Sequence, residues 1–157
     1  MTTWTGRRVV LGVSGGIASY KSCTIARRLV EAGATVDAVL TQAAAEFVRP
    51  LTFEALTGRP VLSSIWERGG ALSHVRLGQE ADLVLVAPAT ANVVARMAQG
   101  LADDLLTTLL LAATAPILLA PAMNDEMFAH PQTTANLELL RKRGVALVGP
   151  EVGALAE

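Results

Sequence analysis

Short, continuously apolar runs alternate along the chain with longer segments in which apolar residues recur every three or four positions. The runs predict strands at residues 7–13, 34–40, 82–87, 116–120 and 145–148, and a further short strand near Val61. The longer segments predict helices at residues 16–32, 91–98, 103–113 and 131–143, and a short helix that begins at His74. Because the strands are apolar throughout and do not alternate, both faces of the sheet must be covered. The pattern therefore predicts a single α/β domain over residues 1–157, with a three-layer, Rossmann-like, doubly wound parallel sheet.

The first half of the chain adds local signals to this pattern. The first predicted helix has an apolar stripe made of Ile17, Tyr20, Ile25 and Leu29. Gly33 marks the end of that helix. Residues 41–58 form a polar-capped segment without a defined element, and Gly69 and Gly70 predict a bend.

Four loops are expected to lie together at one edge of the predicted sheet. In doubly wound sheets, ligands bind beyond the carboxyl ends of the strands, near the point where the strand order reverses. The loops that follow the strands there are residues 14–16, 41–43, 88–92 and 121–124. All four are rich in small or hydrogen-bonding residues, which suits a planar ligand packed against backbone. We therefore expect a ligand site at this edge.

The loop after the first strand, residues 12–16, reads Gly-Val-Ser-Gly-Gly and matches the G-x-S-x-G nucleophile elbow of hydrolases. An elbow needs an oxyanion-hole amide from a loop after an earlier strand, and this is the first strand of the chain. A hydrolase is therefore not expected. The same glycines fit a turn whose backbone amides, at a helix N-terminus, face a phosphate or a flavin. An ordinary tight turn without a ligand is the alternative.

The same loop also lacks the features of a dinucleotide site. Ser14 replaces the central glycine of the G-x-G-x-x-G fingerprint, and the second strand ends in Leu40 and Thr41 without a ribose-binding carboxylate. A nicotinamide cofactor is therefore disfavoured. Thr41 is instead a candidate to bond a ribityl or phosphate oxygen, or to cap a helix.

Composition and charge limit the classes of ligand and the location. The net charge is −1 and the Lys and Arg residues are dispersed, so a small ligand is expected instead of nucleic acid or a membrane. Cys23 is the only cysteine, and with two histidines in the chain neither a disulfide nor a metal site is predicted. No apolar run is long enough to span a bilayer and the N-terminus lacks a signal-peptide core, which predicts a cytoplasmic location. With 52% hydrophobic residues, some apolar surface is expected to be covered by other subunits.

A few polar residues are candidates for chemistry. His74 is one of two histidines and can supply acid–base chemistry near neutral pH, although a surface or capping role is the alternative. Asn124 follows a buried strand at the ligand edge, where its amide can donate to and accept from a substrate carboxylate. Met127 would ordinarily pack in the core. Asp103 and Asp104 open a helix and are most simply N-cap residues.

Five segments, in order, together resemble the phosphopantothenoylcysteine decarboxylase family of homo-oligomeric, flavin-containing cysteine decarboxylases. They are residues 14–21 (Ser-Gly-Gly-Ile-Ala-Ser-Tyr-Lys), His74 with the later Ala81 and Asp82, residues 88–92 (Pro-Ala-Thr-Ala-Asn), residues 102–106 (Ala-Asp-Asp-Leu-Leu) and residues 121–128 (Pro-Ala-Met-Asn-Asp-Glu-Met-Phe). In bacteria, this domain is usually the N-terminal half of a bifunctional protein that also carries a synthetase. The resemblance implies that FMN is bound by Gly15, Gly16, Ile17, Thr41, Thr90, Ala91, Asn92, Val93 and Met123. It also implies that His74 is the catalytic acid–base residue and that Asn124 and Met127 bind the substrate.

The resemblance further implies a carboxy-lyase of coenzyme A biosynthesis, which decarboxylates 4'-phosphopantothenoylcysteine to 4'-phosphopantetheine. An electron sink is needed for that loss of carbon dioxide, and FMN provides it by oxidising the cysteine thiol to a thioaldehyde. The family forms homotrimers, often assembled into homododecamers, with the flavin near a subunit contact. The alternatives are a peptidyl-cysteine decarboxylase of peptide natural-product maturation, which stops at the ene-thiol, and a non-catalytic flavin-binding regulatory subunit. A flavin prenyltransferase is disfavoured by the segment at residues 121–128.

Two positions depart from the family pattern. Phe128 stands where the family usually has Trp, which keeps an aromatic wall. The family's flap carries a cysteine within a Leu-Ala-Cys-Gly stretch, whereas this chain reads Leu155, Ala156 and Glu157. The chain is therefore either an excised domain that lacks the rest of the flap or an enzyme that reduces its intermediate in a different way. Cys23 lies in the first predicted helix and is expected to pack as a small hydrophobe, so it does not replace the flap cysteine.

Overall fold

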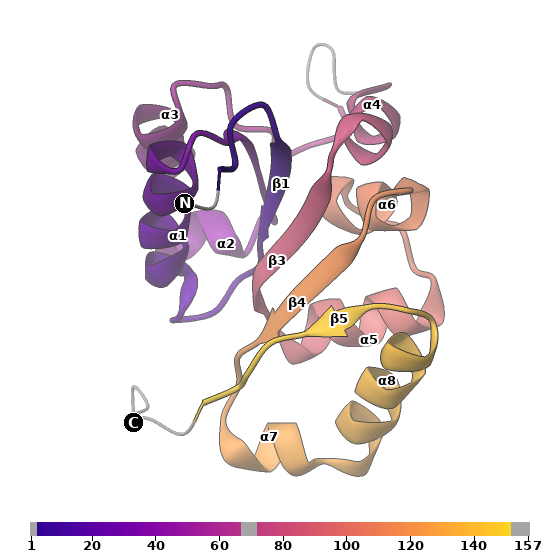
Figure 1. Ribbon diagram of the computed structural model, residues 1–157. Coiled ribbons are helices and arrows are strands. Elements are labelled where there is room, and N and C mark those ends of the chain that lie inside the picture. The colour runs from indigo at the N-terminus through magenta and orange to yellow at the C-terminus, as the bar shows by residue number, and fades with distance from the viewer. Residues whose placement is uncertain (1–2, 67–71, 152–157) are drawn as a thin grey trace.

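The computed structural model describes residues 3–66 and 72–151, which fold around one five-stranded parallel sheet (Figure 1). The strands are β1 (Arg8–Val13), β2 (Thr35–Leu40), β3 (Leu83–Ala89), β4 (Ile117–Pro121) and β5 (Ala146–Leu147). Their order is β2-β1-β3-β4-β5, so the chain reverses direction across the sheet between β1 and β3. That reversal is the switch point of a doubly wound sheet and confirms the predicted α/β fold class.

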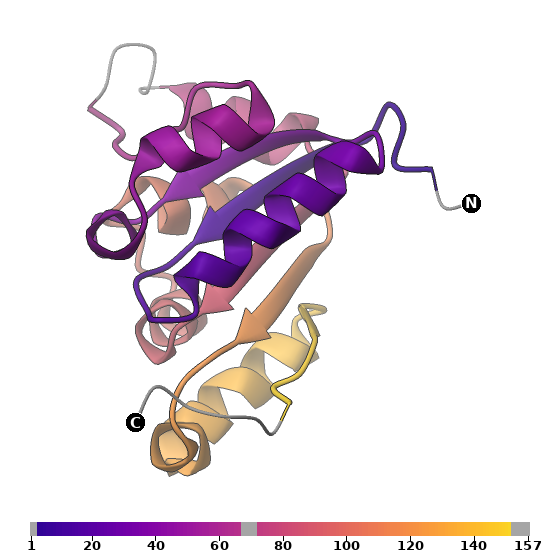
Figure 2. The ribbon, with the colours of Figure 1, turned by 90° about the vertical axis from the view of Figure 1, so that its left-hand side faces the viewer.

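Helices cover both faces of the sheet (Figure 2). One face carries α1 (Ser19–Glu31), α2 (Ala44–Phe47) and α3 (Pro50–Thr57). The other carries α4 (Ser73–Glu80), α5 (Ala91–Gln99), α6 (Leu105–Ala112) and α8 (Pro131–Lys142). The short helix α7 (Asp125–Ala129) follows β4. No helix in the described part of the chain is long and apolar enough to cross a membrane.

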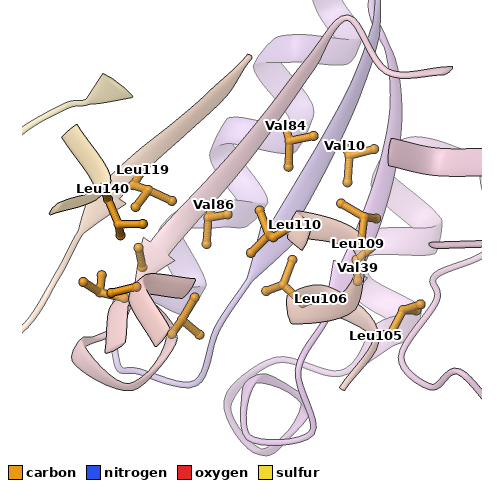
Figure 3. Close-up of a cluster of buried hydrophobic side chains, with 14 of the residues drawn as sticks. Val10, Val39, Val84, Val86, Leu105, Leu106, Leu109, Leu110, Leu119 and Leu140 are labelled. Atoms are coloured by element: carbon orange, nitrogen blue, oxygen red, sulfur yellow. The ribbon is translucent and has the colours of Figure 1, made fainter. Parts of the chain in front are cut away.

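Each face of the sheet has its own apolar core. On the α6 side, Val10, Val84 and Val86 pack with leucines of α6, among them Leu106 and Leu109 (Figure 3). Burial of each such side chain contributes about 1.5–3 kcal/mol. The helix approaches the sheet closely, because a Cβ placed on Gly12 of β1 would lie 2.6 Å from the Leu106 side chain.

The predicted apolar stripe of the first helix is wrong at its N-terminal end. The helix starts at Ser19, three residues later than expected, and the side chains of Ile17 and Tyr20 are 58% and 59% exposed. Small residues face the sheet in their place, since Ser19, Ser22 and Ala26 are buried. The Ser22 hydroxyl donates to the Ala87 carbonyl at 2.5 Å, which holds the start of α1 against the end of β3. Small side chains allow this approach, and the larger apolar ones point away.

Other elements differ in extent from the prediction. The segment at residues 41–58 contains α2 and α3, and the strand expected near Val61 is reduced to one bridge between Val39 and Leu62. The helix α7 was not predicted because five residues are too few to show a period. The bend expected at Gly69 and Gly70 lies outside the described residues.

Charged residues close the amino edge of the sheet, opposite the predicted ligand site. The buried Asp37 carboxylate accepts from Arg8 at 3.1 Å and from Arg59 at 2.6 Å. Asp82 accepts from the Arg8 backbone amide at 2.7 Å and from Arg7 at 3.1 Å. The bond from the Arg8 amide, followed by the one from the Arg7 side chain, lowers the pKa of Asp82 below its ordinary value. These pairs hold the starts of three strands together.

Candidate functional site

The carboxyl ends of β1, β2, β3 and β4 open into one large cavity of about 1730 Å³. Ligand pockets usually have about 300–1,000 Å³, so this cavity has room for a cofactor and a second molecule. Eleven of the twelve predicted site residues line it: Gly15, Gly16, Ile17, Thr41, Thr90, Ala91, Asn92, Val93, Met123, Asn124 and Met127. The structure therefore brings the loops together as the strand pattern predicted.

Ser14 ties two of these loops together. Its buried hydroxyl donates to the Pro88 carbonyl at 2.5 Å and accepts from the Thr90 backbone amide at 3.1 Å. A hydroxyl has one proton, and here it is already donated to a carbonyl. Among the described residues, no histidine lines the cavity to act as a base. Ser14 is thus a structural link, which agrees with the exclusion of a hydrolase.

Gly15 and Gly16 bring the backbone close to neighbouring loops. A Cβ on Gly15 would lie 2.7 Å from the Ala43 carbonyl carbon and closer still to the Ala43 Cβ. A Cβ on Gly16 would lie at an ordinary contact distance of 3.4 Å from the Thr90 side chain. The Ser19 hydroxyl accepts from the Gly16 amide at 3.3 Å and holds this turn ahead of α1. The first loop therefore needs a glycine at position 15 to pack beside the second.

Two threonines combine capping with a place in the cavity. Thr90 is the N-cap of α5, and its hydroxyl oxygen accepts from the Val93 amide at 3.4 Å. The amides of Ala91 and Asn92, in the first turn of α5, have no intrahelical acceptor and suit an anionic or carbonyl group. Thr41 accepts from the Ala44 amide at 3.1 Å, so the predicted capping alternative is present. Its hydroxyl proton can still donate to a ligand.

Asn124 is oriented by its own helix. It is the N-cap of α7, and its side-chain oxygen accepts from the Met127 amide at 2.9 Å. That bond uses one of the two lone pairs of the oxygen and orients the side chain, and both N–H donors of the NH₂ group remain for a ligand. These donors suit a carboxylate. Met127 lies in the same cavity wall and is 48% exposed, so it is not a core residue.

His74 is the predicted site residue that the single chain does not bring to the cavity. It lies on α4, which packs against α6, and Figure 1 shows this helix at the start of β3, away from the strand ends that form the cavity. The side chain is half-buried, and its Nδ1 atom is buried without a hydrogen-bond partner within the described residues. Because Nδ1 is covered by the chain itself, only the exposed part of the ring is open to a further contact.

The structure adds residues that the sequence did not single out. Arg96 lines the cavity, donates to the Asn92 side chain at 3.3 Å and forms an ion pair with Asp103. That bond from Arg96 lowers the pKa of Asp103. The four-residue spacing of Asn92 and Arg96 was the available signal. Trp66, 88% exposed, also lines the cavity, and nothing in its local sequence marks it.

The paired N-cap role expected for Asp103 and Asp104 is half correct. Asp104 caps α6 in a capping box, where its carboxylate accepts from the Thr107 amide at 2.7 Å. Asp103 instead pairs with Arg96. The missing flap cysteine concerns residues 155–157, which lie outside the described residues.

Together, the switch-point cavity, its small-residue loops and the helix N-termini around it define an α/β protein that binds a planar or phosphate-bearing ligand. The sequence profile of the Flavoprotein family matches residues 2–157, and the chain belongs to this family.

Comparisons with individual proteins agree with this family membership. The chain is 49% identical over 158 residues to the coenzyme A biosynthesis bifunctional protein CoaBC of Vibrio cholerae serotype O1, a match that covers 99% of this chain and 40% of that protein. The chain thus spans about 40% of the length of this curated relative.

Among solved structures, the chain is similar to the FMN-dependent cysteine decarboxylase SpaF, with a TM-score of 0.88 and 34% identity over 96% of this chain and 88% of that one. It is also similar to a cysteine variant of a PPC decarboxylase complexed with pantothenoylaminoethenethiol, with a TM-score of 0.84 and 32% identity over 96% and 85%.

Proposed function

We propose that this chain is the flavoprotein domain of an FMN-dependent cysteine decarboxylase of coenzyme A biosynthesis, acting in the cytoplasm. Its substrate is 4'-phosphopantothenoylcysteine and its product is 4'-phosphopantetheine. The observation that carries this proposal is the similarity of 99% of the chain to the N-terminal part of CoaBC at 49% identity. The likeness to two solved cysteine decarboxylases supports the same reaction class.

The residues around the cavity fit FMN. The turn at Gly15 and Gly16 leads into the N-terminus of α1, whose positive end stabilises a phosphate. Thr41 has a hydroxyl proton to donate to a phosphate or ribityl oxygen. The first turn of α5 supplies the amides of Ala91 and Asn92 to the polar edge of a flavin ring.

Asn124 positions the cysteine carboxylate, which leaves as carbon dioxide. Its NH₂ group is fixed by the bond from the Met127 amide to its oxygen, so it presents donors to the cysteine carboxylate. When bound, FMN would accept two electrons from the cysteine side chain, so that a carbon–sulfur double bond can take up the electrons of decarboxylation, and would return them to the product, which makes the overall reaction redox-neutral. A neutral amide holds the carboxylate without a strong ion pair, which would stabilise the charged ground state more than the transition state.

We propose further that His74 acts in the cavity of a neighbouring subunit within a trimer or a multiple of it. The His74 side chain is only half-buried, so part of its ring can meet a second subunit, and it does not line its own cavity. Exposed leucines lie on the same side: Leu72 at the start of α4 and Leu111 on α6, which packs against α4. A second subunit that covers this apolar surface would bury it and bring His74 to another cavity.

A peptide that ends in cysteine is the second candidate substrate. Loss of carbon dioxide from a terminal cysteine is the same chemistry. The FMN-dependent cysteine decarboxylase SpaF, described by its cysteine chemistry alone, resembles as much of the chain as the PPC decarboxylase does. Identity to the coenzyme A protein is higher, at 49% against 34%, so the small substrate is preferred.

The test is incubation of the purified protein with 4'-phosphopantothenoylcysteine and with a cysteine-terminated peptide, followed by carbon dioxide release and mass spectrometry. We expect carbon dioxide from the small substrate at the higher kcat/KM. Faster release from the peptide would favour peptide maturation, and no release from either would leave the regulatory alternative.

His74→Asn should abolish release while FMN remains bound. His130→Asn is the matched control, because His130 caps α8 by accepting from the Gln132 amide at 3.0 Å and Asn is also a good cap. Equal turnover in both variants would remove His74 from catalysis.

A further inference from the structure

Three polar side chains form a connected row along the wall of the cavity. Asn92, Arg96 and Asp103 all line it. The Arg96 Nε atom donates to the Asn92 side-chain oxygen at 3.3 Å, and the Arg96 Nη1 atom forms an ion pair with Asp103. Asn92 and Arg96 are four residues apart and share one face of α5, whereas Asp103 comes from the segment that precedes α6. The row therefore joins two elements at the cavity.

Arg96 fixes the direction in which the Asn92 carboxamide points. A carboxamide has one oxygen that accepts and one NH₂ group that donates. Because a guanidinium has donors only, it holds the Asn92 oxygen, and the NH₂ group is turned away from Arg96. Asn92 is exposed, whereas Arg96 is half-buried. The first turn of α5 thus presents side-chain donors beside the free backbone amides of Ala91 and Asn92.

The two charges of the ion pair are unequally screened. The Arg96 side chain is 30% exposed and the Asp103 side chain is 62% exposed, so water screens the carboxylate more than the guanidinium. The guanidinium is also the nearer charge to Asn92, because it bonds that side chain directly. The neighbouring Asp104 carboxylate is partly compensated by the N-terminus of α6, where it accepts from the Thr107 amide at 2.7 Å. A group bound at Asn92 therefore experiences a net positive field.

A purely structural role for Arg96 is the alternative. Arg96 lies in the last turn of α5, where a cation stabilises the end of a helix. Its guanidinium, however, donates to two side chains that line the cavity. Arg143 instead donates to the Ala98 carbonyl of the same helix end at 3.1 Å. The contacts of Arg96 therefore point to the cavity, while Arg143 serves the helix end.

On the basis of the function proposed above, the first turn of α5 meets the polar edge of the flavin ring. Charge placed near that edge tunes the electronics of a flavin. We propose that Arg96 is a positioning residue that directs the Asn92 NH₂ group to this edge, and that the Arg96–Asp103 pair sets the redox potential of the bound flavin. A donor and a positive charge stabilise the electron-rich reduced ring more than the oxidised one, so they raise the potential. Arg96 takes no part in proton transfer.

Opposite charge changes separate this role from a structural one. Arg96→Met keeps the length and helix propensity of the side chain and removes its charge and its donors, whereas Asp103→Asn removes the opposing charge. The midpoint potential of bound FMN, measured by redox titration without substrate, should fall in Arg96→Met and rise in Asp103→Asn. Arg96→Lys, which keeps the charge, should stay close to the wild type. Loss of an ion pair that is only structural would move both variants in the same direction, and that result, or no shift in either, would overturn the proposal.

Arg143→Met is the matched control. It removes a contact to the end of the same helix, and within the described residues Arg143 does not line the cavity. The potential in this variant should equal that of the wild type. A shift as large as the one in Arg96→Met would assign the effect to the helix end and would also overturn the proposal.

Flavin affinity is the second readout. Arg96→Met should raise Kd for FMN and for riboflavin by the same factor, about three- to tenfold, as for loss of one hydrogen bond to the ring that both share. A loss confined to FMN would place Arg96 at the phosphate and contradict the proposal.

The remaining outcomes are also decisive. Asp103 is exposed, so Asp103→Asn tests the proposal even if Arg96→Met does not fold, and an unchanged or lowered potential in it would be contrary evidence. Because neither readout uses substrate, a wild-type protein that binds FMN but releases no carbon dioxide would contradict the proposed function alone. A wild-type protein that binds no flavin would overturn both.

Discussion

Gly15→Ala is predicted to destabilise the protein because the fold leaves no room for a methyl group at this position. The added methyl group would lie 2.7 Å from the Ala43 carbonyl carbon and closer still to the Ala43 Cβ, so two loops at the ends of β1 and β2 would have to move apart. The obstacle includes backbone, which cannot rotate away as a flexible side chain does. Gly15 is not in the left-handed region, so the effect comes from contact and not from backbone strain.

The expected cost is about 1–3 kcal/mol of unfolding free energy, the usual range for overpacking. Gly16→Ala is the matched control, because its new methyl group meets the Thr90 side chain at an ordinary 3.4 Å. Loss of chain entropy in the unfolded state should make that variant neutral or more stable by up to about 1 kcal/mol. Urea unfolding of the flavin-free proteins measures both changes, and FMN titration reports the displaced loop. If Gly15→Ala unfolds at the same urea concentration as the wild type, the described packing of these loops is wrong.

Three other predictions follow from single contacts. Asn124→Asp should keep its helix cap and its stability, since both residues cap well, but should raise KM for the carboxylated substrate while binding of 4'-phosphopantetheine, which lacks that carboxylate, stays unchanged. Ser14→Ala should lower the unfolding free energy by about 1–3 kcal/mol, because the Thr90 amide loses its acceptor in a buried site; an unchanged urea midpoint would contradict this. Asp82 has a lowered pKa, so its stabilisation is complete above the ordinary aspartate pKa of about 3.9 and is lost as pH falls through the folded-state value. Asp82→Asn should therefore lower Tm near pH 6 and flatten its fall in acid, and parallel Tm–pH curves would show that Asp82 contributes nothing.

Much of this site could be predicted because it depends on strand order along the chain. Continuously apolar strands indicate a sheet covered on both faces, and the carboxyl ends of parallel strands meet at one edge. The strand pattern alone therefore predicts that Thr41, Thr90 and Asn124 lie close together, although each is far from the others in sequence. Periodicity alone was enough for that step.

What could not be predicted depends on close packing and on side-chain contacts that a hydrophobicity pattern does not show. The outward position of Ile17 and Tyr20 follows from small residues on the inner face of α1, which a hydrophobicity pattern ranks below the apolar ones. The pairing of Arg96 with Asp103 joins α5 to the segment that precedes α6. His74 was singled out by residue type, and its absence from the cavity lining appears only in three dimensions.

The central claim is that bound FMN and this cavity together decarboxylate a cysteine conjugate. The most direct measurement is carbon dioxide release by flavin-free protein titrated with FMN, using 4'-phosphopantothenoylcysteine labelled with ¹³C in its cysteine carboxyl group. Labelled carbon dioxide should be absent without flavin, rise in proportion to bound FMN and level off when the sites are filled. Release from the flavin-free protein, or none from the fully loaded protein, would contradict the claim.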